Sequence, residues 1–119
     1  MDRRITFLTE RMSSNLQKKW DVEEMAQIVN LSPPHLINLF KIHTGTSPIH
    51  YLRELRLEKS RDLLENTFLQ IKQIGSQVGI PDQSHFVRYF KEKHNLSPAE
   101  YRRRHWAKLE GEKSEDDKS

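Results

Sequence analysis

The chain has 119 residues, of which 31% are charged and 34% are hydrophobic, and it contains no cysteine. This length suits one small domain or two joined subdomains, and the composition allows small apolar cores rather than one large core. Without cysteine, disulfides, thiolate zinc sites and cysteine nucleophiles are excluded. No stretch approaches the roughly 20 apolar residues of a membrane helix, and no signal segment opens the chain. The sequence therefore predicts a soluble, intracellular protein.

Positive charge is concentrated in the part of the chain that is expected to fold. The net charge is +3, but residues 110–119 hold five acidic and two basic residues, which leaves +6 on residues 1–109. A basic domain favours an anionic partner such as nucleic acid. A basic protein without such a partner would have the same composition.

The hydrophobic pattern predicts an all-α fold of about seven helices. Apolar residues recur three and four positions apart nearly throughout, without the alternation typical of strands. The first helix is expected over residues 4–17, with a stripe made of Ile5, Leu8, Met12 and Leu16. The second is expected over residues 22–30, because Asp21 is a good N-cap and Glu24 is its capping-box partner.

Serine-proline pairs mark the starts of later helices. Ser32 caps a helix with Pro33 in its first turn, where a missing N–H costs nothing, and this helix is expected to end near His43. Ser47-Pro48 opens a longer helix to about Glu65. Further helices are expected over residues 71–78, from Asp82 or Gln83 to about His94, and over residues 98–106.

An internal repeat relates the two halves of the chain. The first copy contains His35, Phe40, Lys41, Ser47, Pro48, Tyr51 and Arg53, and the second contains, 50 residues later, His85, Phe90, Lys91, Ser97, Pro98, Tyr101 and Arg103. Upstream the offset is 49, and Val22, Met25, Ala26, Val29 and Leu31 match Ile71, Ile74, Gly75, Val78 and Ile80. One residue has therefore been added near Pro81.

Each copy has the features of a helix-turn-helix unit. Two helices are joined by a short turn with an apolar residue, and a small residue in the first helix (Ala26 or Gly75) lets the second cross closely above it. A generic helical hairpin is the alternative. Two copies in phase favour the helix-turn-helix interpretation.

The second helix of each unit exposes a stripe of side chains that could read DNA bases. In the first unit Leu36, Leu39 and Phe40 point inward, and Pro34, Ile37, Asn38 and Lys41 point outward or lie on the flank. In the second unit Phe86, Tyr89 and Phe90 point inward, and Ser84, His85, Val87, Arg88 and Lys91 point outward or lie on the flank. A helix in the major groove must expose such a stripe.

The outward residues have suitable chemistry for DNA. Arg88 suits guanine O6 and N7, Asn38 suits adenine N6 and N7, and Ser84 and His85 can donate or accept. Lys41 and Lys91 suit phosphate, and the helix N-termini at Ser32, Ser47, Gln83 and Ser97 can offer backbone N–H groups to phosphate. The alternatives are ordinary solvated charges at Arg88 and Lys91, and histidines that cap or pack near the turns.

The length of the central helix suits two contacts with one duplex. Residues 48–65 span about 27 Å at roughly 1.5 Å per residue. Recognition helices at its ends could lie close to one DNA turn apart, about 34 Å. A single chain could then read two successive major grooves.

The pattern resembles the DNA-binding domain of the AraC/XylS family of bacterial transcription regulators over residues 4–105. The first half of the match comprises residues 36–41, Gly45, Ser47-Pro48, Tyr51-Leu52, residues 55–57 and Leu63-Leu64. The second half comprises Ile74, Val78-Gly79, Asp82, Ser84, Phe86, Arg88, Phe90-Lys91, Ser97-Pro98 and Tyr101-Arg102.

The resemblance implies a fold and a set of base-reading residues. It implies two helix-turn-helix subdomains, over residues 4–53 and 66–106, joined by a linker helix over residues 48–65. The base-reading positions carried over are Pro34, Ile37, Asn38, Ser84, His85 and Arg88. Pro34 and Ile37 cannot donate to a base, so the first unit is expected to read through thymine methyls or DNA shape. Ser60, Gly75, Ile80 and Asn95 depart from the family's usual residues.

The resemblance also implies partners. It implies double-stranded promoter DNA, RNA polymerase and monomeric seating on one DNA face, in the bacterial cytoplasm and nucleoid, with activation as the expected mode of regulation. Most members carry a separate sensor or dimerisation domain, so the chain is expected to be the C-terminal part of a larger regulator or a stand-alone one. The acidic tail over residues 110–119 is expected to be disordered.

The sequence does not favour an enzyme or a cofactor site. The six histidines are scattered without metal-ligand spacing, and no glycine-rich phosphate loop is present. The main alternative function is a helical protein-interaction module. Such a module would bind DNA without steep salt dependence, because no counterions would be released.

Overall fold

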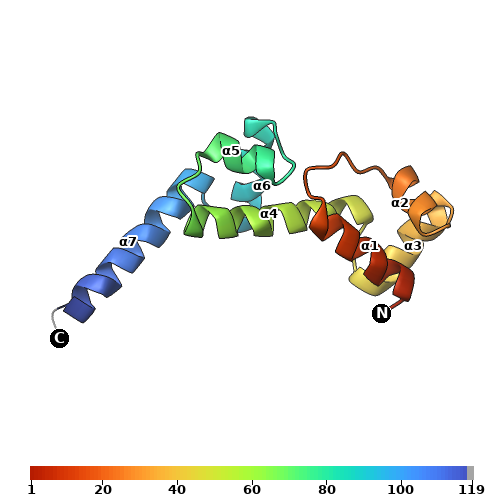
Figure 1. Cartoon of the computed structure of the whole chain (residues 1–119), viewed down its shortest axis with the longest axis horizontal. Coiled ribbons are helices and arrows are strands. Elements are labelled where there is room, and N and C mark those ends of the chain that lie inside the picture. The colour runs from red at the N-terminus through yellow and green to blue at the C-terminus, as the bar shows by residue number, and fades with distance from the viewer. Residues whose placement is uncertain (118–119) are drawn as a thin grey trace. The chain divides into compact units, whose positions relative to one another are not determined.

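The computed structural model describes residues 1–117, with side chains up to Gly111, and the described chain is all-α (Figure 1). Its seven helices are α1 (Arg3–Ser14), α2 (Val22–Ile28), α3 (Pro33–Thr44), α4 (Pro48–Asn66), α5 (Ile71–Gln77), α6 (Gln83–His94) and α7 (Pro98–Asp117). The predicted fold class is confirmed. The chain divides into two compact units, residues 1–56 and the residues from Leu57 onward, and the boundary falls within α4.

The first unit is built around the apolar faces of α1, α2 and α3. Its buried core comprises Ile5, Leu8, Met12, Met25, Ala26, Val29, Leu36, Phe40 and Leu52. The predicted stripe on α1 is confirmed except for Leu16, which lies beyond the helix and packs against the core from the loop. The helix ends early because the Asn15 side chain donates to the carbonyl of Arg11. In a further helical turn this carbonyl would accept a backbone N–H instead.

The second unit repeats this plan with α5, α6 and α7. Its buried core comprises Leu57, Leu64, Ile74, Val78, Ile80, Phe86 and Phe90. Phe40 and Phe90, predicted as core residues, are both fully buried, and each packs edge-on against its tyrosine, Tyr51 or Tyr101. Aromatic pairs in this geometry add to the stability gained by burial.

Both helix-turn-helix turns have the same backbone conformation. Asn30 and Gly79 adopt positive φ angles of 60° and 90°, and the next residue donates its N–H back into the preceding helix. Leu31 N bonds the Ala26 carbonyl at 2.9 Å, and Ile80 N bonds the Gly75 carbonyl at 2.8 Å. This left-handed helix end closes the turn and brings its apolar residue to the core.

The extra residue of the second turn lies where the offset between the repeats changes. Ser32 accepts the His35 N–H and Asp82 accepts the His85 N–H, so the N-caps of α3 and α6 are 50 residues apart. The turn residues Leu31 and Ile80 are 49 residues apart. Pro81 is the added residue, as predicted.

An arginine in each unit bonds carbonyls that are distant in sequence and lie at a connection between two helices or at the helix end next to it. Arg56 donates to the carbonyls of Leu16 and Lys18, at 3.0 and 2.8 Å. Arg102 donates to the carbonyls of Leu63, Leu64, Thr67 and Leu69. Burial lowers the pKa of both guanidinium groups. These arginines hold the α1–α2 and α4–α5 connections in place.

The last helix is longer than the sequence analysis expected. α7 continues to Asp117, past the predicted end at Trp106 and through most of the segment expected to be disordered; residues 118–119 lie outside the described part. Residues 107–110 are good helix formers without proline, so nothing local stops the helix at Trp106.

None of the helices in the described part combines the length and the apolarity needed to cross a bilayer.

Candidate nucleic-acid interface

The outer face of α3 carries the residues predicted to read DNA in the first unit. Leu36 and Phe40 are fully buried, which orients the helix. Pro34, Ile37, Asn38 and Lys41 are exposed on the other side. Ile37 is 42% exposed, so the surface offered by α3 is partly apolar and contains one amide and one ammonium group.

The outer face of α6 is more polar and is hollowed. Gln83, Ser84, Val87, Arg88 and Lys91 line an open hollow on the surface of the second unit. Ser84, His85, Arg88 and Lys91 are exposed, whereas Phe86 and Phe90 are fully buried. The structure thus brings Ser84 and Arg88, predicted to read bases, together with Gln83 and Lys91, predicted to contact phosphate, around one hollow; His85 is exposed on the same helix but does not line it, and Ser97 caps α7.

Tyr89 supports two of these side chains, a role that the sequence analysis missed. The Arg88 guanidinium lies 5.1 Å from the centre of the Tyr89 ring and its Nη2 is 3.5 Å from the tyrosine hydroxyl. The His85 ring lies 5.9 Å from the same ring. Tyr89 itself packs against the core of the second unit. Helical periodicity indicated its inward direction but not its contacts with the outer face.

The N-terminus of α6 is occupied by a carboxylate. Asp82 accepts the His85 N–H at 2.9 Å, and this bond, with the nearby His85 ring, holds the pKa of Asp82 below its usual range. The Asp82 carboxylate therefore stays ionised at neutral pH. A phosphate at the α6 N-terminus would meet this charge, which leaves Lys91 as the better phosphate contact on α6.

The N-terminus of α3 has few backbone donors for phosphate. Pro33 and Pro34 have no N–H, the His35 N–H bonds the Ser32 hydroxyl, and the Leu36 N–H bonds the Ser32 carbonyl. Ser47 and Ser97 cap α4 and α7 in the same way, by accepting the N–H groups of His50 and Glu100. Each serine hydroxyl keeps its own proton to donate, so a phosphate contact at these caps would come from the side chain.

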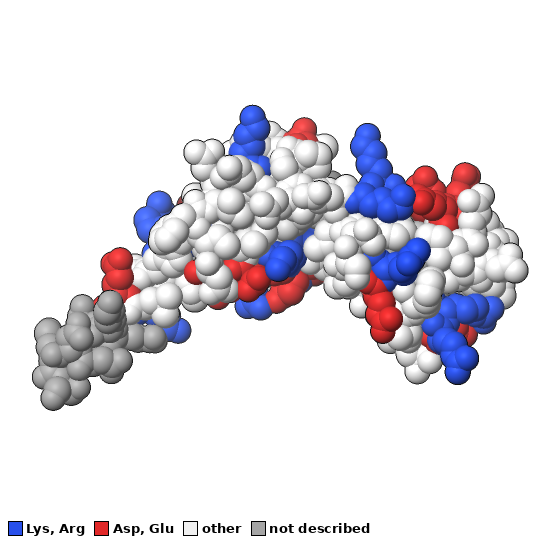
Figure 2. All heavy atoms as spheres, viewed as in Figure 1, with Lys and Arg blue, Asp and Glu red and all other residues white. Residues whose placement is uncertain are grey.

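Basic and acidic side chains are interspersed on the surface. Figure 2 shows lysines and arginines singly or in small groups, with acidic residues among them on the same face. Among the described residues, no group of three histidine or acidic side chains could hold a metal ion. The described part of the face shown in Figure 2 therefore has no broad, purely basic area.

Comparisons with known proteins agree with this geometry. The family model described as "Helix-turn-helix domain" matches residues 25–104. A solved structure of a transcriptional regulator from Chromobacterium violaceum, titled as containing an AraC-type DNA-binding domain, is 32% identical with a TM-score of 0.79, and the match covers 86% of this chain and 91% of that one. The chain belongs to the AraC-type helix-turn-helix family.

Curated AraC-type relatives extend well beyond the matched region. The arabinose operon regulatory protein of Escherichia coli is 34% identical over 86% of this chain and 35% of its own length. The lactose operon transcription activator of Staphylococcus xylosus is 37% identical over 76% of this chain and 33% of its own length. The chain spans about a third of the length of these relatives. The family and these relatives are transcription regulators rather than enzymes.

Proposed function

We propose that the chain is the DNA-binding domain of a bacterial transcription regulator and reads two successive major grooves of promoter DNA with α3 and α6. The observation that carries this proposal is the repeated exposed stripe on two helices whose opposite faces are locked into cores. The packing of the cores alone does not explain why the same exposed stripe occurs at corresponding positions of two helices. Membership of the AraC-type family supports the same function.

The two units divide the reading of bases unequally in this proposal. Ser84, His85 and Arg88 of α6 provide hydrogen-bonding groups for base edges, and Arg88 is matched to guanine. Pro34 and Ile37 of α3 offer apolar contacts, such as a thymine methyl group, and only Asn38 offers an amide. The second unit therefore carries most of the sequence preference.

Phosphate contacts position both units in this proposal. Lys41 and Lys91 lie about one helical turn beyond the base-reading residues, and their ammonium groups contact phosphates of the DNA backbone. The hydroxyls of Ser32, Ser47 and Ser97 donate to phosphate from the helix caps. Gln83 is exposed at the edge of the α6 hollow and contributes through its side-chain amide.

The partners proposed for the chain are those of a longer regulator. We infer a separate sensor or dimerisation domain, since the curated relatives are about three times as long as the matched region. We also propose contact with RNA polymerase, activation of transcription, and action in the bacterial cytoplasm on nucleoid DNA. Each DNA site would seat one copy of the domain.

Fluorescence anisotropy with a labelled duplex across a salt series tests the proposal. The duplex is one selected from a random pool by the protein. If the chain neutralises several phosphates, the logarithm of the association constant should fall linearly with the logarithm of the salt concentration, with a slope of about −0.9 per phosphate contact. A Lys41→Ala and Lys91→Ala double variant is the control and should reduce the slope by about two. If the random pool yields no bound duplex even at 50 mM salt, the DNA-binding proposal is wrong and the protein-interaction module is the remaining alternative.

A further inference from the structure

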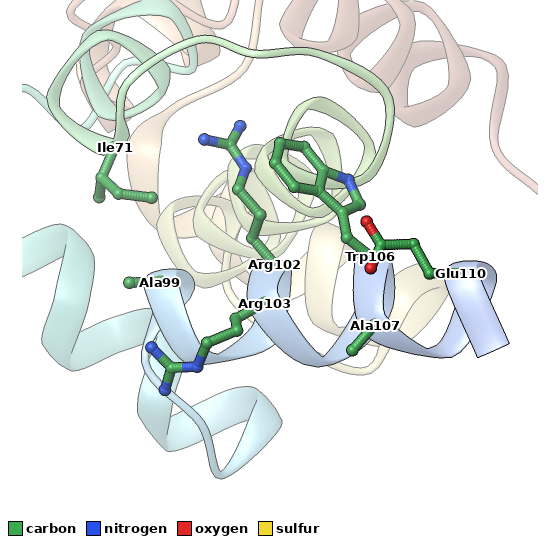
Figure 3. A pocket seen from close by; sticks show the side chains of 7 residues that line it. All are labelled: Ile71, Ala99, Arg102, Arg103, Trp106, Ala107 and Glu110. Carbon is green, nitrogen blue, oxygen red and sulfur yellow. The ribbon is translucent and has the colours of Figure 1, made fainter.

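A largely apolar groove runs along α7 in the second unit, apart from the α6 surface. Its lining residues are Ile71, Ala99, Arg102, Arg103, Trp106, Ala107 and Glu110 (Figure 3). None of them lines the hollow on α6. The groove is thus a second surface feature that base reading does not use.

The wall of the groove is held in place by long-range bonds. Trp106 Nε1 donates to the Glu65 carbonyl at 3.1 Å, and the Arg102 guanidinium lies 5.0 Å from the Trp106 ring centre. The Arg102 guanidinium is itself bonded to α4–α5 carbonyls. Because these polar groups are satisfied internally, the groove presents the indole without a need to rearrange on binding.

An exposed phenylalanine extends the apolar surface of the groove. Phe68 is 91% exposed and contacts Trp106 edge-on, with ring centres 5.4 Å apart. Leu109, on the next turn of α7, is 48% exposed. Aromatic side chains on a preformed apolar surface are typical of protein interfaces rather than of surface in contact only with water.

The charges along the groove are self-complementary. Ala99, Arg103, Trp106 and Glu110 follow the four-three-four spacing of a coiled-coil seam on α7. Arg103 and Glu110 lie on either side of Trp106 and Ala107 along the helix, seven residues or about 10.5 Å apart (Figure 3). A second α7 that packs antiparallel places its Glu110 against Arg103 and its Arg103 against Glu110, with the tryptophans at the centre.

We propose that this groove binds a second copy of the chain, α7 against α7 in antiparallel orientation, around a two-fold axis near Trp106 and Ala107. An isologous contact needs one patch that complements itself, and the pair Arg103 and Glu110 fulfils this condition. The contact itself does not require DNA, whereas its effect at neighbouring DNA sites rests on the proposed function. Two helices in contact over about three turns form an interface below the standard size. The contact is therefore weak, with a Kd on the order of 0.1–1 mM, and becomes significant where two copies bind neighbouring DNA sites.

Sedimentation of the full chain between 20 μM and 1 mM tests this contact. We expect concentration-dependent dimerisation of the parent, and at least a tenfold increase in Kd for Arg103→Glu and for Glu110→Arg, since each change places like charges opposite each other. Arg104→Glu makes the same charge change at an exposed neighbouring position outside the groove. It should leave Kd within about threefold of the parent.

The double variant Arg103→Glu with Glu110→Arg decides the orientation. It exchanges the two charges, restores both opposite-charge contacts and should return Kd to within about threefold of the parent. Circular dichroism of each variant verifies that the helices are intact. A parent that stays monomeric at 1 mM, an Arg103→Glu variant that behaves like Arg104→Glu, or a double variant that fails to recover would each overturn the proposal.

Discussion

Single residues distinguish the outer faces of α3 and α6, the two helices proposed to read DNA. On α6 the exposed groups are a hydroxyl, an imidazole and a guanidinium, at Ser84, His85 and Arg88. The groups predicted to read bases on α3 are a proline ring, an aliphatic chain and one amide, at Pro34, Ile37 and Asn38, although the repeat also places an exposed histidine, His35, at the position of His85. Tyr89 lies beneath two of the α6 groups, whereas Leu39 occupies the matching position on α3. The polar groups proposed to read bases are therefore concentrated on the second unit.

Replacement of Arg88 and of Lys91 should have different effects. Arg88→Ala is expected to cost about 1–3 kcal/mol on the selected site and to relax the preference at one base position. Lys91→Ala should weaken binding to all sequences alike and reduce the salt slope by about one. Competition assays with duplexes that differ at single positions distinguish the two results. If Arg88→Ala keeps the parent's preference at every position, Arg88 is not a base-reading residue.

At the scale of the elements, the close crossing of helices explains the small residue in each unit. A Cβ at Gly75 would lie 2.8 Å from the Ile80 carbonyl oxygen and 3.2 Å from Phe86 Cδ2. The first of these contacts is with backbone, which cannot move without disturbing the turn. The first unit has Ala26 at the matching position, buried to within 1%. The second turn thus approaches its first helix too closely for even a methyl group.

Gly75→Ala should destabilise the second unit despite the better helix propensity of alanine. The clash is expected to lower the free energy of unfolding by about 1–3 kcal/mol. Gly111→Ala in α7 is the matched control, because nothing lies within 4 Å of its Cβ position, and it should stabilise by up to about 1 kcal/mol. Urea unfolding followed by Trp106 fluorescence in a Trp20→Phe background measures both. Equal stability of Gly75→Ala and the parent would contradict the close packing.

At the scale of the whole molecule, the chain consists of two similar units that share one continuous helix. Each unit has its own core, its own helix-turn-helix and its own arginine bonded to a connecting loop. The helix α4 is 19 residues long and contributes to both units. If α3 and α6 read successive grooves, as proposed, the spacing of the two half-sites on DNA becomes a property of the intact chain.

Changing the spacing of the half-sites should reduce affinity sharply. Reading of successive grooves predicts two half-sites about 10–10.5 base pairs apart in the selected duplex. Insertion of five base pairs turns one half-site to the opposite face of the helix, and affinity should fall to that of a duplex with the α6 half-site alone. Titration of the three duplexes measures this. Undiminished binding after insertion would show that one unit acts independently.

Local sequence signals were sufficient for most of the fold and for the exposed faces. Helical spacing, the caps Asp21 and Ser32 and the repeat located seven helices, the buried Phe40 and Phe90, and the residue added at Pro81. These features depend on interactions within a few residues, or on a pattern that occurs twice. The exposure of Asn38 and Arg88 followed from the same periodicity.

Only the tertiary structure determined which polar groups are engaged and where the second surface forms. Arg102 bonds carbonyls more than 30 residues away, and Trp106 bonds the carbonyl of Glu65. No local spacing distinguishes Arg102 from the exposed Arg103 and Arg104 that follow it. Contacts between residues distant in sequence depend on how the helices pack. The sequence by itself therefore determined which faces are available, and packing decided which arginine stabilises the fold and which arginines stay exposed.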